Sequence, residues 1–373
     1  MKFMIYDLRL MKRARLGTTC FRFLLLLLSL NVQLSMSFAQ GSLTPPGAPV
    51  PTMRSLGQVE PRTPIASLPF VITNSGSYYL TENLAGSSKF TNGITISVAD
   101  VTLDLMGFAL VGGAGDGIVV RGTCTNVAVR NGTVRGWSGN GVDLFEGRAG
   151  QLERLRVSGN GGRGIYAGLG SVVNHCTAYA NNGNGISVTI GVTVNGCSAY
   201  SNGGDGIVTS SGCTVTDSTA RLNGGHGIST STACTISRCT AYNNSGTGIF
   251  GTVGSTVIDC TVSFNGLAGI QVTNSCRIVQ NNCYNNSGAG IHATGGDNRI
   301  EGNNITGNHL GIDADGIGNL IIRNSASGNT TNFVIVAGNK VGPIAAAPDS
   351  AAISGDTGGS GVGSTNPWAN VSY

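Results

Sequence analysis

Residues 185–206 read GISVTIGVTVNGCSAYSNGGDG, and residues 206–227 read GIVTSSGCTVTDSTARLNGGHG. Both stretches begin with Gly followed by Ile, carry Thr-Val in the middle and place an Asn four residues before the next repeat's Gly. Gly followed by Ile or Val recurs at eleven regularly spaced places between residues 93 and 312, first every 23 or 24 residues and then every 21. A fixed period of this length indicates stacked structural repeats.

Each repeat predicts three short strands. Ile186 and Val188, two residues apart, point to the same side because side chains alternate along a strand. Thr193-Val194 predicts a second strand, and Ala199 marks the inward residue of a third. Joined by bends rich in Gly and Asn, these strands predict an all-β fold, a right-handed parallel β-helix of about 12 coils. A leucine-rich repeat is disfavoured because no Leu framework recurs with the period.

A family resemblance rests on these same units. The pattern Gly-Ile-x-Val, then Val, Cys-x-Ala-Tyr and Asn-x-Gly, as in residues 185–206, resembles the right-handed β-helix repeats of the pectate-lyase-like superfamily. Residues 51–65, followed by Gly-Ser-Tyr-Tyr-Leu at residues 76–80, are similar to exported bacterial members of that superfamily. The resemblance implies the fold and an association with carbohydrate, and it implies no particular reaction.

Composition divides the chain into segments. Residues 1–39 read as a secretory signal peptide, with basic residues before an apolar run and Ser-Phe-Ala at the expected cleavage site. Residues 40–64 form a Pro-rich lead-in, residues 65–92 strands that cap the first coil, residues 93–336 the β-helix, and residues 337–373 a C-terminal cap and flexible tail. We therefore expect a secreted, periplasmic or cell-surface protein with no transmembrane segment after signal cleavage.

The charge balance argues against nucleic-acid binding. The whole chain has 22 basic and 18 acidic residues. Residues 1–39 hold six of the basic residues and one of the acidic ones, so the remainder is close to neutral. Proteins that bind nucleic acid generally carry a strong basic footprint, and this footprint is missing from the expected mature chain. Arginines gather between residues 121 and 163, where an acidic polysaccharide could dock.

Cysteine and asparagine recur in register with the repeat. Nine cysteines follow the expected signal peptide and fall mostly into two columns that point inward. Buried thiols, one or two disulfides and a metal site are all compatible with this pattern. Seven asparagines, from Asn160 to Asn286, stand four residues before the next repeat's Gly. Asn tolerates the tight bend expected there, and stacked Asn side chains can bond from coil to coil.

One polar cluster offers a candidate for catalysis. His292 and Asp313 hold the same place in adjacent repeats, and Asp315 lies two residues further on. A His beside two carboxylates can act as an acid or a base, and Asp313 and Asp315 can hold calcium through oxygen ligands. No other cofactor is expected. Gly225-His226-Gly227 is similar to a motif of polygalacturonase-type glycosidases, but the acidic motifs of that family are absent.

A column of aromatic residues offers a candidate for binding. The expected register places one outward stripe along the stack, made of Tyr179, Tyr200, Arg221, Tyr242 and Tyr284. These side chains can stabilise one another by ring and cation–π contacts. They can also form a flat platform for sugar rings.

The sequence favours an exported, non-catalytic binder of polysaccharide or surface glycan through this stripe. One alternative is a polysaccharide lyase or glycoside hydrolase of the pectate-lyase-like superfamily. Another is a structural or adhesive protein of the envelope. The repeats contain no lysine to act as a lyase base, and no acidic trio converges on one coil, which favours binding.

Overall fold

The computed structural model describes residues 60–87, 89, 91–346 and 365–373. The chain divides into two compact units, Met1–Glu60 and Pro61–Tyr373, and the second contains nearly all the described residues. The expected signal peptide and all but the end of the Pro-rich lead-in fall outside them. No helix that could cross a membrane occurs in the described part of the chain.

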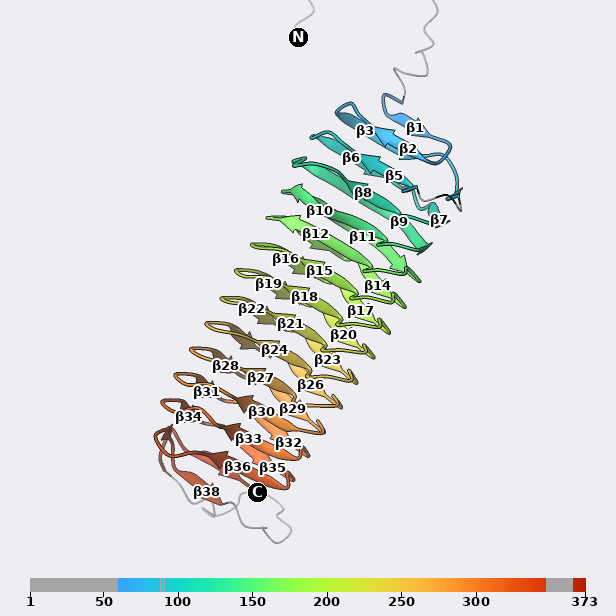
Figure 1. Ribbon diagram of the computed structural model, residues 1–373. Helices are drawn as coiled ribbons and strands as arrows, with labels where there is room; N and C mark the ends of the chain where they lie inside the picture. Colours follow the sequence, from blue (N-terminus) through green and yellow to red (C-terminus); the bar gives the residue numbers. More distant parts are fainter. Residues whose placement is uncertain (1–59, 88, 90, 347–364) are drawn as a thin grey trace, which may run out of the picture. The chain divides into compact units, whose positions relative to one another are not determined.

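The described residues of Pro61–Tyr373 form a stack of coils built from parallel strands (Figure 1). The eleven strands at the recurring Gly-Ile or Gly-Val, together with one strand before them and one after them, form a 13-stranded parallel sheet. In order, they are β2 (Phe70–Ile72), β5 (Ile94–Ile96), β8 (Ile118–Val120), β10 (Val142–Arg148), β12 (Ile165–Leu169), β15 (Ile186–Val188), β18 (Ile207–Thr209), β21 (Ile228–Thr230), β24 (Ile249–Gly251), β27 (Ile270–Val272), β30 (Ala289–Ala293), β33 (Leu310–Ala314) and β36 (Thr331–Ile335).

The other strands of each coil form two further columns. One column consists of β1 (Thr63–Ile65), β3 (Gly76–Leu80), β6 (Val101–Asp104), β9 (Val127–Trp137), β11 (Gln151–Ser158), β13 (Val172–Asn174), β16 (Thr193–Asn195), β19 (Thr214–Thr216), β22 (Thr235–Ser237), β25 (Thr256–Ile258), β28 (Arg277–Val279), β31 (Arg299–Glu301), β34 (Leu320–Ile322) and β37 (Lys340–Val341). The other consists of β4 (Leu84–Ala85), β7 (Ala109–Gly113), β9, β11, β14 (Thr177–Tyr179), β17 (Ser198–Tyr200), β20 (Thr219–Arg221), β23 (Thr240–Tyr242), β26 (Thr261–Ser263), β29 (Asn282–Tyr284), β32 (Asn304–Thr306), β35 (Ser325–Ser327), β39 (Asn370–Ser372) and β38 (Ile344–Ala346). Because β9 and β11 run through both columns, the two columns count as one 26-stranded sheet.

The predicted inward residues are confirmed. Ile186, Val194 and Ala199, one from each strand of a coil, are completely buried. Such residues stack on the same residue types in the next coil and form one continuous apolar core. The recurring Gly is explained by this packing. A Cβ added at Gly185 would lie 2.6 Å from Nδ2 of Asn202 and 2.7 Å from a backbone oxygen, closer than real Cβ atoms come.

A ladder of buried asparagines fixes the bend before each Gly-Ile strand. The side-chain oxygen of Asn202 accepts hydrogen bonds from the backbone N–H and the side-chain Nδ2 of Asn181, at 3.1 and 3.0 Å. The same two bonds repeat from Asn160 to Asn329, so the predicted coil-to-coil bonding is confirmed. The ladder continues through Asn308 although the sequence spacing slips there by one residue.

The two ends of the stack differ in detail from the coils and caps expected from the sequence. The strands assigned to a cap at residues 65–92 pair in parallel with the next coil, as all later strands do. The 13-stranded sheet therefore starts at β2, before the first recurring Gly-Ile, and has one strand more than the expected 12 coils. At the other end, β39 inserts between β35 and β38, and Asn370 there accepts two hydrogen bonds from Asn324.

Candidate glycan platform and polar cluster

The predicted aromatic stripe lies on the column of strands that contains β14, β17 and β20. Backbone pairing aligns its members directly, one coil after another. The rings of Tyr179 and Tyr200 stack in parallel, with centroids 5.0 Å apart and an angle of 5° between planes. The guanidinium of Arg221 lies 4.5 Å from the centroid of Tyr200. The structure thus brings these three predicted residues into one continuous stack, which we call the Tyr/Arg ladder.

The other two predicted tyrosines belong to a separate cluster. Ser263 takes the place between Tyr242 and Tyr284 in the column, so the two tyrosines have no shared ring contact. Phe264, the next residue along the chain, bridges them instead, with edge-to-face contacts at 5.6 and 5.4 Å. Sequence reasoning missed Phe264 because it lies on the bend rather than on the strand. Tyr242, Phe264 and Tyr284 are each at least 40% exposed.

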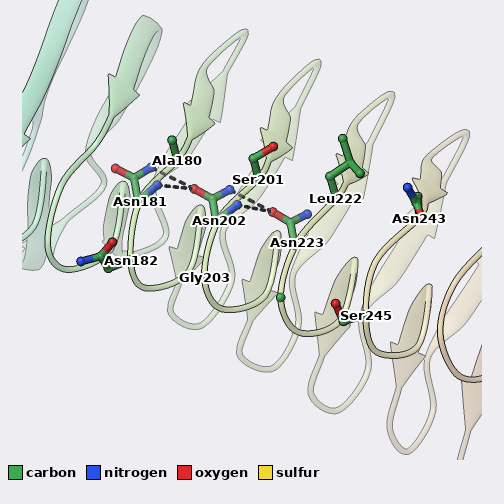
Figure 2. A pocket seen from close by; sticks show the side chains of 11 residues that line it. Ala180, Asn181, Asn182, Ser201, Asn202, Gly203, Leu222, Asn223, Asn243 and Ser245 are labelled. Carbon is green, nitrogen blue, oxygen red and sulfur yellow. Dashed lines mark hydrogen bonds between the residues drawn. The ribbon is translucent and has the colours of Figure 1, made fainter.

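A groove runs beside the Tyr/Arg ladder. Its volume is about 660 Å³. It is lined by Ala180, Asn181, Asn182, Ser201, Asn202, Gly203, Leu222, Asn223, Gly224, Asn243 and Ser245. Figure 2 shows Asn181, Asn202 and Asn223 of the asparagine ladder between two rows of lining residues. One row begins with Ala180 and Ser201, and the other contains Asn182 and Ser245. Four coils contribute to it, so it extends about 14 Å along the stack at ~4.8 Å per coil.

The groove has a rigid floor and adaptable walls. Asn181, Asn202 and Asn223 use their side chains on one another and are buried, so they hold the floor in place. Ser201 and Asn243 lie on the exposed walls. Residue 201 follows Tyr200 directly, so the wall and the Tyr/Arg ladder are adjacent. The residues just before the groove's asparagines are Ala180, Ser201 and Leu222, which share no residue type, so the sequence carries no repeating signal for this groove.

The sequence-predicted polar cluster also forms. Backbone pairing places His292 directly opposite Asp313 on β30 and β33. The Nε2 atom of His292 lies 2.9 Å from a carboxylate oxygen of Asp315 and 3.7 Å from one of Asp313. Burial raises the pKa of Asp313, the nearby Asp315 charge raises it further, and His292 opposes this. The three side chains therefore make a compact group on the outer face of the 13-stranded sheet, away from the Tyr/Arg ladder's column.

His226 has a structural role. Its Nδ1 atom accepts a hydrogen bond from the backbone N–H of Thr247 at 3.0 Å. The backbone N–H of His226 donates a hydrogen bond to the carboxylate of Asp205. Its ring stacks on Phe250 at 5.5 Å. Since Nδ1 is an acceptor, the ring proton of a neutral imidazole lies on Nε2. His226 thus joins one coil to the next, as an asparagine does elsewhere in the chain.

The early arginines are partly neutralised. Arg130 pairs with Asp104 at 3.1 Å, and Arg154 pairs with Glu153 at 3.1 Å. Arg121 lies 3.8 Å from both Asp116 and Glu146. These ion pairs reduce the positive charge available to an acidic ligand.

Comparison with known proteins agrees with the geometry. A family model described as "Right handed beta helix region" matches residues 116–256 and 250–344. Among solved structures, the chain is similar to the A-module of the mannuronan C-5 epimerase AlgE6 from Azotobacter vinelandii, with a TM-score of 0.56 and 15% identity over 67% of this chain and 90% of that one.

Two further structures are similar at lower scores. The A-module of mannuronan C-5 epimerase AlgE4 from the same organism gives a TM-score of 0.48, with 15% identity over 72% of this chain and 91% of that one. The pectate lyase Pel9A gives 0.36, with 16% identity over 67% and 68%. No curated protein matches the sequence. The family model, together with the fold-level likeness to the AlgE6 A-module, supports the predicted right-handed parallel β-helix.

Proposed function

The chain belongs to the right-handed β-helix family, and from this premise we propose that it is an exported protein that binds a polysaccharide in the groove beside the Tyr/Arg ladder. The observation that carries the proposal is the parallel stack of Tyr179 and Tyr200, capped by Arg221, because each of the three directly precedes a groove-lining residue in the chain. The ligand class follows from the similar A-module, which is named for the polysaccharide mannuronan.

The Tyr/Arg ladder suits a sugar ligand for physical reasons. Tyr offers a flat apolar face together with a hydroxyl, so it can pack on a sugar ring and hydrogen-bond to it. The rings of Tyr179 and Tyr200 already support each other, so little side-chain freedom is lost when a ligand binds. The rigid groove floor lowers the ordering cost in the same way.

Arg221 suits an acidic sugar. No carboxylate among the described residues forms an ion pair with it, and its guanidinium is held over Tyr200. The groove lining combines polar side chains with Ala180 and Leu222 and contains no charged residue. A carboxylate on the ligand would therefore meet a positioned and unpaired cation, and such hydrogen bonds to charged groups are among the strong ones.

The test is a panel of polysaccharides that includes mannuronan, polygalacturonate and a neutral β-glucan. Affinity electrophoresis detects binding, while assays for unsaturated products and reducing ends detect turnover. We expect binding without turnover, and we expect Ser245→Trp to abolish it by filling the groove from its wall. Turnover of any polysaccharide in the panel would contradict a purely binding function and would show that the protein is an enzyme. Binding that Ser245→Trp leaves unchanged would show that the groove is not the binding site.

Export is part of the proposal. Expression of the full chain in a bacterial host should give a mature protein that begins at Gln40 and lies outside the cytoplasm. N-terminal sequencing of the fractionated protein checks this. An uncleaved protein in the cytoplasm would contradict it.

A further inference from the structure

We propose that His292, Asp313 and Asp315 bind one first-row divalent cation of the Zn²⁺ class. The three side chains each offer one ligand atom, and all of these atoms lie within 4.8 Å of one another. This inference does not depend on glycan binding.

The spacing of the ligand atoms fits a coordination sphere. Bonds of about 2.1 Å to nitrogen and oxygen place neighbouring ligand atoms roughly 3.0–3.4 Å apart. The observed distances from Nε2 of His292 are 2.9 Å to Asp315 and 3.7 Å to Asp313. Small side-chain rotations would therefore bring all three atoms onto one cation.

The cluster also has more negative charge than its neighbours offset. A single proton on Nε2 of His292 can serve the carboxylate at 2.9 Å, and the other carboxylate at 3.7 Å is beyond hydrogen-bond reach. No lysine or arginine among the described residues pairs with Asp313 or Asp315. Asp313 is nevertheless mostly shielded from water, with 16% of its side chain exposed. A divalent cation would contact all three groups and supply the missing charge.

The backbone holds the three ligands in place. His292 and Asp313 are direct partners on β30 and β33, so their Cα positions are fixed by the sheet. Asp315 follows two residues after Asp313, and its backbone N–H donates to Ala293, which keeps the end of β33 against β30. Two of the three ligands thus lie on paired strands, which position side chains more precisely than a loop does.

The ligand types select the metal. Calcium takes six to eight oxygen ligands, and the calcium assignment from sequence used only the two aspartates. The imidazole nitrogen and the small number of ligands favour zinc or a neighbouring first-row metal. Three protein ligands leave at least one coordination position open to water or to a ligand.

The test uses the full chain, stripped with EDTA, after its accessible thiols have been alkylated so that cysteine cannot bind the metal. Titration with ZnCl2 by calorimetry and measurement of bound zinc after gel filtration should give one equivalent. His292→Ala and Asp315→Asn should each weaken binding by at least about 100-fold, since removing even an outer-shell partner costs 10–100-fold. His175→Ala, which changes a histidine outside the cluster, should leave binding unchanged.

Three results would overturn the proposal. They are the absence of zinc binding by the unmodified sequence, equal zinc binding by His292→Ala, and calcium binding that zinc does not compete with. Asp315 is 58% exposed, so Asp315→Asn keeps the fold and tests the site even where another variant unfolds.

Discussion

Asn223→Ala interrupts the asparagine ladder at the middle of the stack. Asn223 is 1% exposed, and its side-chain oxygen accepts hydrogen bonds from the backbone N–H and from Nδ2 of Asn202, at 3.1 and 3.0 Å. Its own Nδ2 donates to the backbone oxygen of Ala199 and to the side-chain oxygen of Asn244, at 3.1 and 2.9 Å. Alanine removes all four bonds.

The cost follows from the groups that lose their partners. The backbone N–H of Asn202 and one hydrogen of its Nδ2 are left without an acceptor in a residue that is 2% exposed. A buried donor without a partner costs about 1–3 kcal/mol. Two such donors, partly relieved by water from the adjacent groove, predict a loss of about 3 kcal/mol in the free energy of unfolding.

Unfolding in urea, followed by circular dichroism, measures this change. Asn182→Ala is the matched control, because Asn182 is a neighbouring exposed asparagine outside the ladder, and we expect it to stay within about 0.5 kcal/mol of the original chain. Each coil contacts only its neighbours, so the variant's transition should also broaden as the two halves of the stack lose cooperativity. A loss below about 1 kcal/mol would show that water replaces the ladder bonds and would refute the reasoning.

Three further predictions concern the core, the polar cluster and the thiols. Trp137→Ala should lower the free energy of unfolding by about 3–5 kcal/mol in urea titrations, because Trp137 is buried to 1% and fills the interior of the early coils; a loss under about 1 kcal/mol would contradict this. The pKa of Asp313 is higher in the folded chain than its unfolded value of 3.8, so folding favours the protonated carboxyl group. This contribution to stability is present at pH values below 3.8 and is lost as the pH rises through the pKa of the folded state. In EDTA, Asp313→Asn should therefore raise the melting temperature at pH 7 and should lose this advantage near pH 3; an equal effect at both pH values would count against it. The nine described cysteines are all buried and free, so Ellman's reagent should modify them only in denaturant, and fast reaction in the native chain would disprove their burial.

The repeat fold could be predicted from sequence because each coil repeats one physical solution. Ile or Val at the position of Ile186, and Ala at the position of Ala199, return at a fixed spacing along the repeats. Their inward direction therefore followed from the alternation of side chains along a strand. The extra first coil could not be predicted, since β2 begins with Phe70 rather than with Gly-Ile. The insertion of β39 was also missed, because its partner strand β35 lies more than forty residues earlier and pairs with it only in three dimensions.

The candidate sites were predictable where register alone decides contact. His292 and Asp313 meet because they hold the same place in adjacent coils. The Tyr/Arg ladder formed for the same reason. The contacts of Phe264 could not be predicted in this way. Phe264 lies on a bend, where its ring contacts Tyr242 and Tyr284, and the alternation of side chains along a strand does not give the direction of a residue on a bend. The groove likewise depends on the shape of the bends, which Ala180, Ser201 and Leu222, residues of different types, do not report in the sequence.

The most direct test of the central claim compares two tyrosines. Tyr200 stacks in the Tyr/Arg ladder, while Tyr166 stacks between Phe145 and Arg163 on the 13-stranded sheet. Tyr166→Ala is therefore the control, because it removes an equally stacked tyrosine ring from a different face of the protein. For a polysaccharide selected from the panel, calorimetry should give a Kd raised about 30-fold by Tyr200→Ala, equivalent to ~2 kcal/mol, and unchanged by Tyr166→Ala. Equal effects of the two substitutions, or no effect of Tyr200→Ala, would contradict the account.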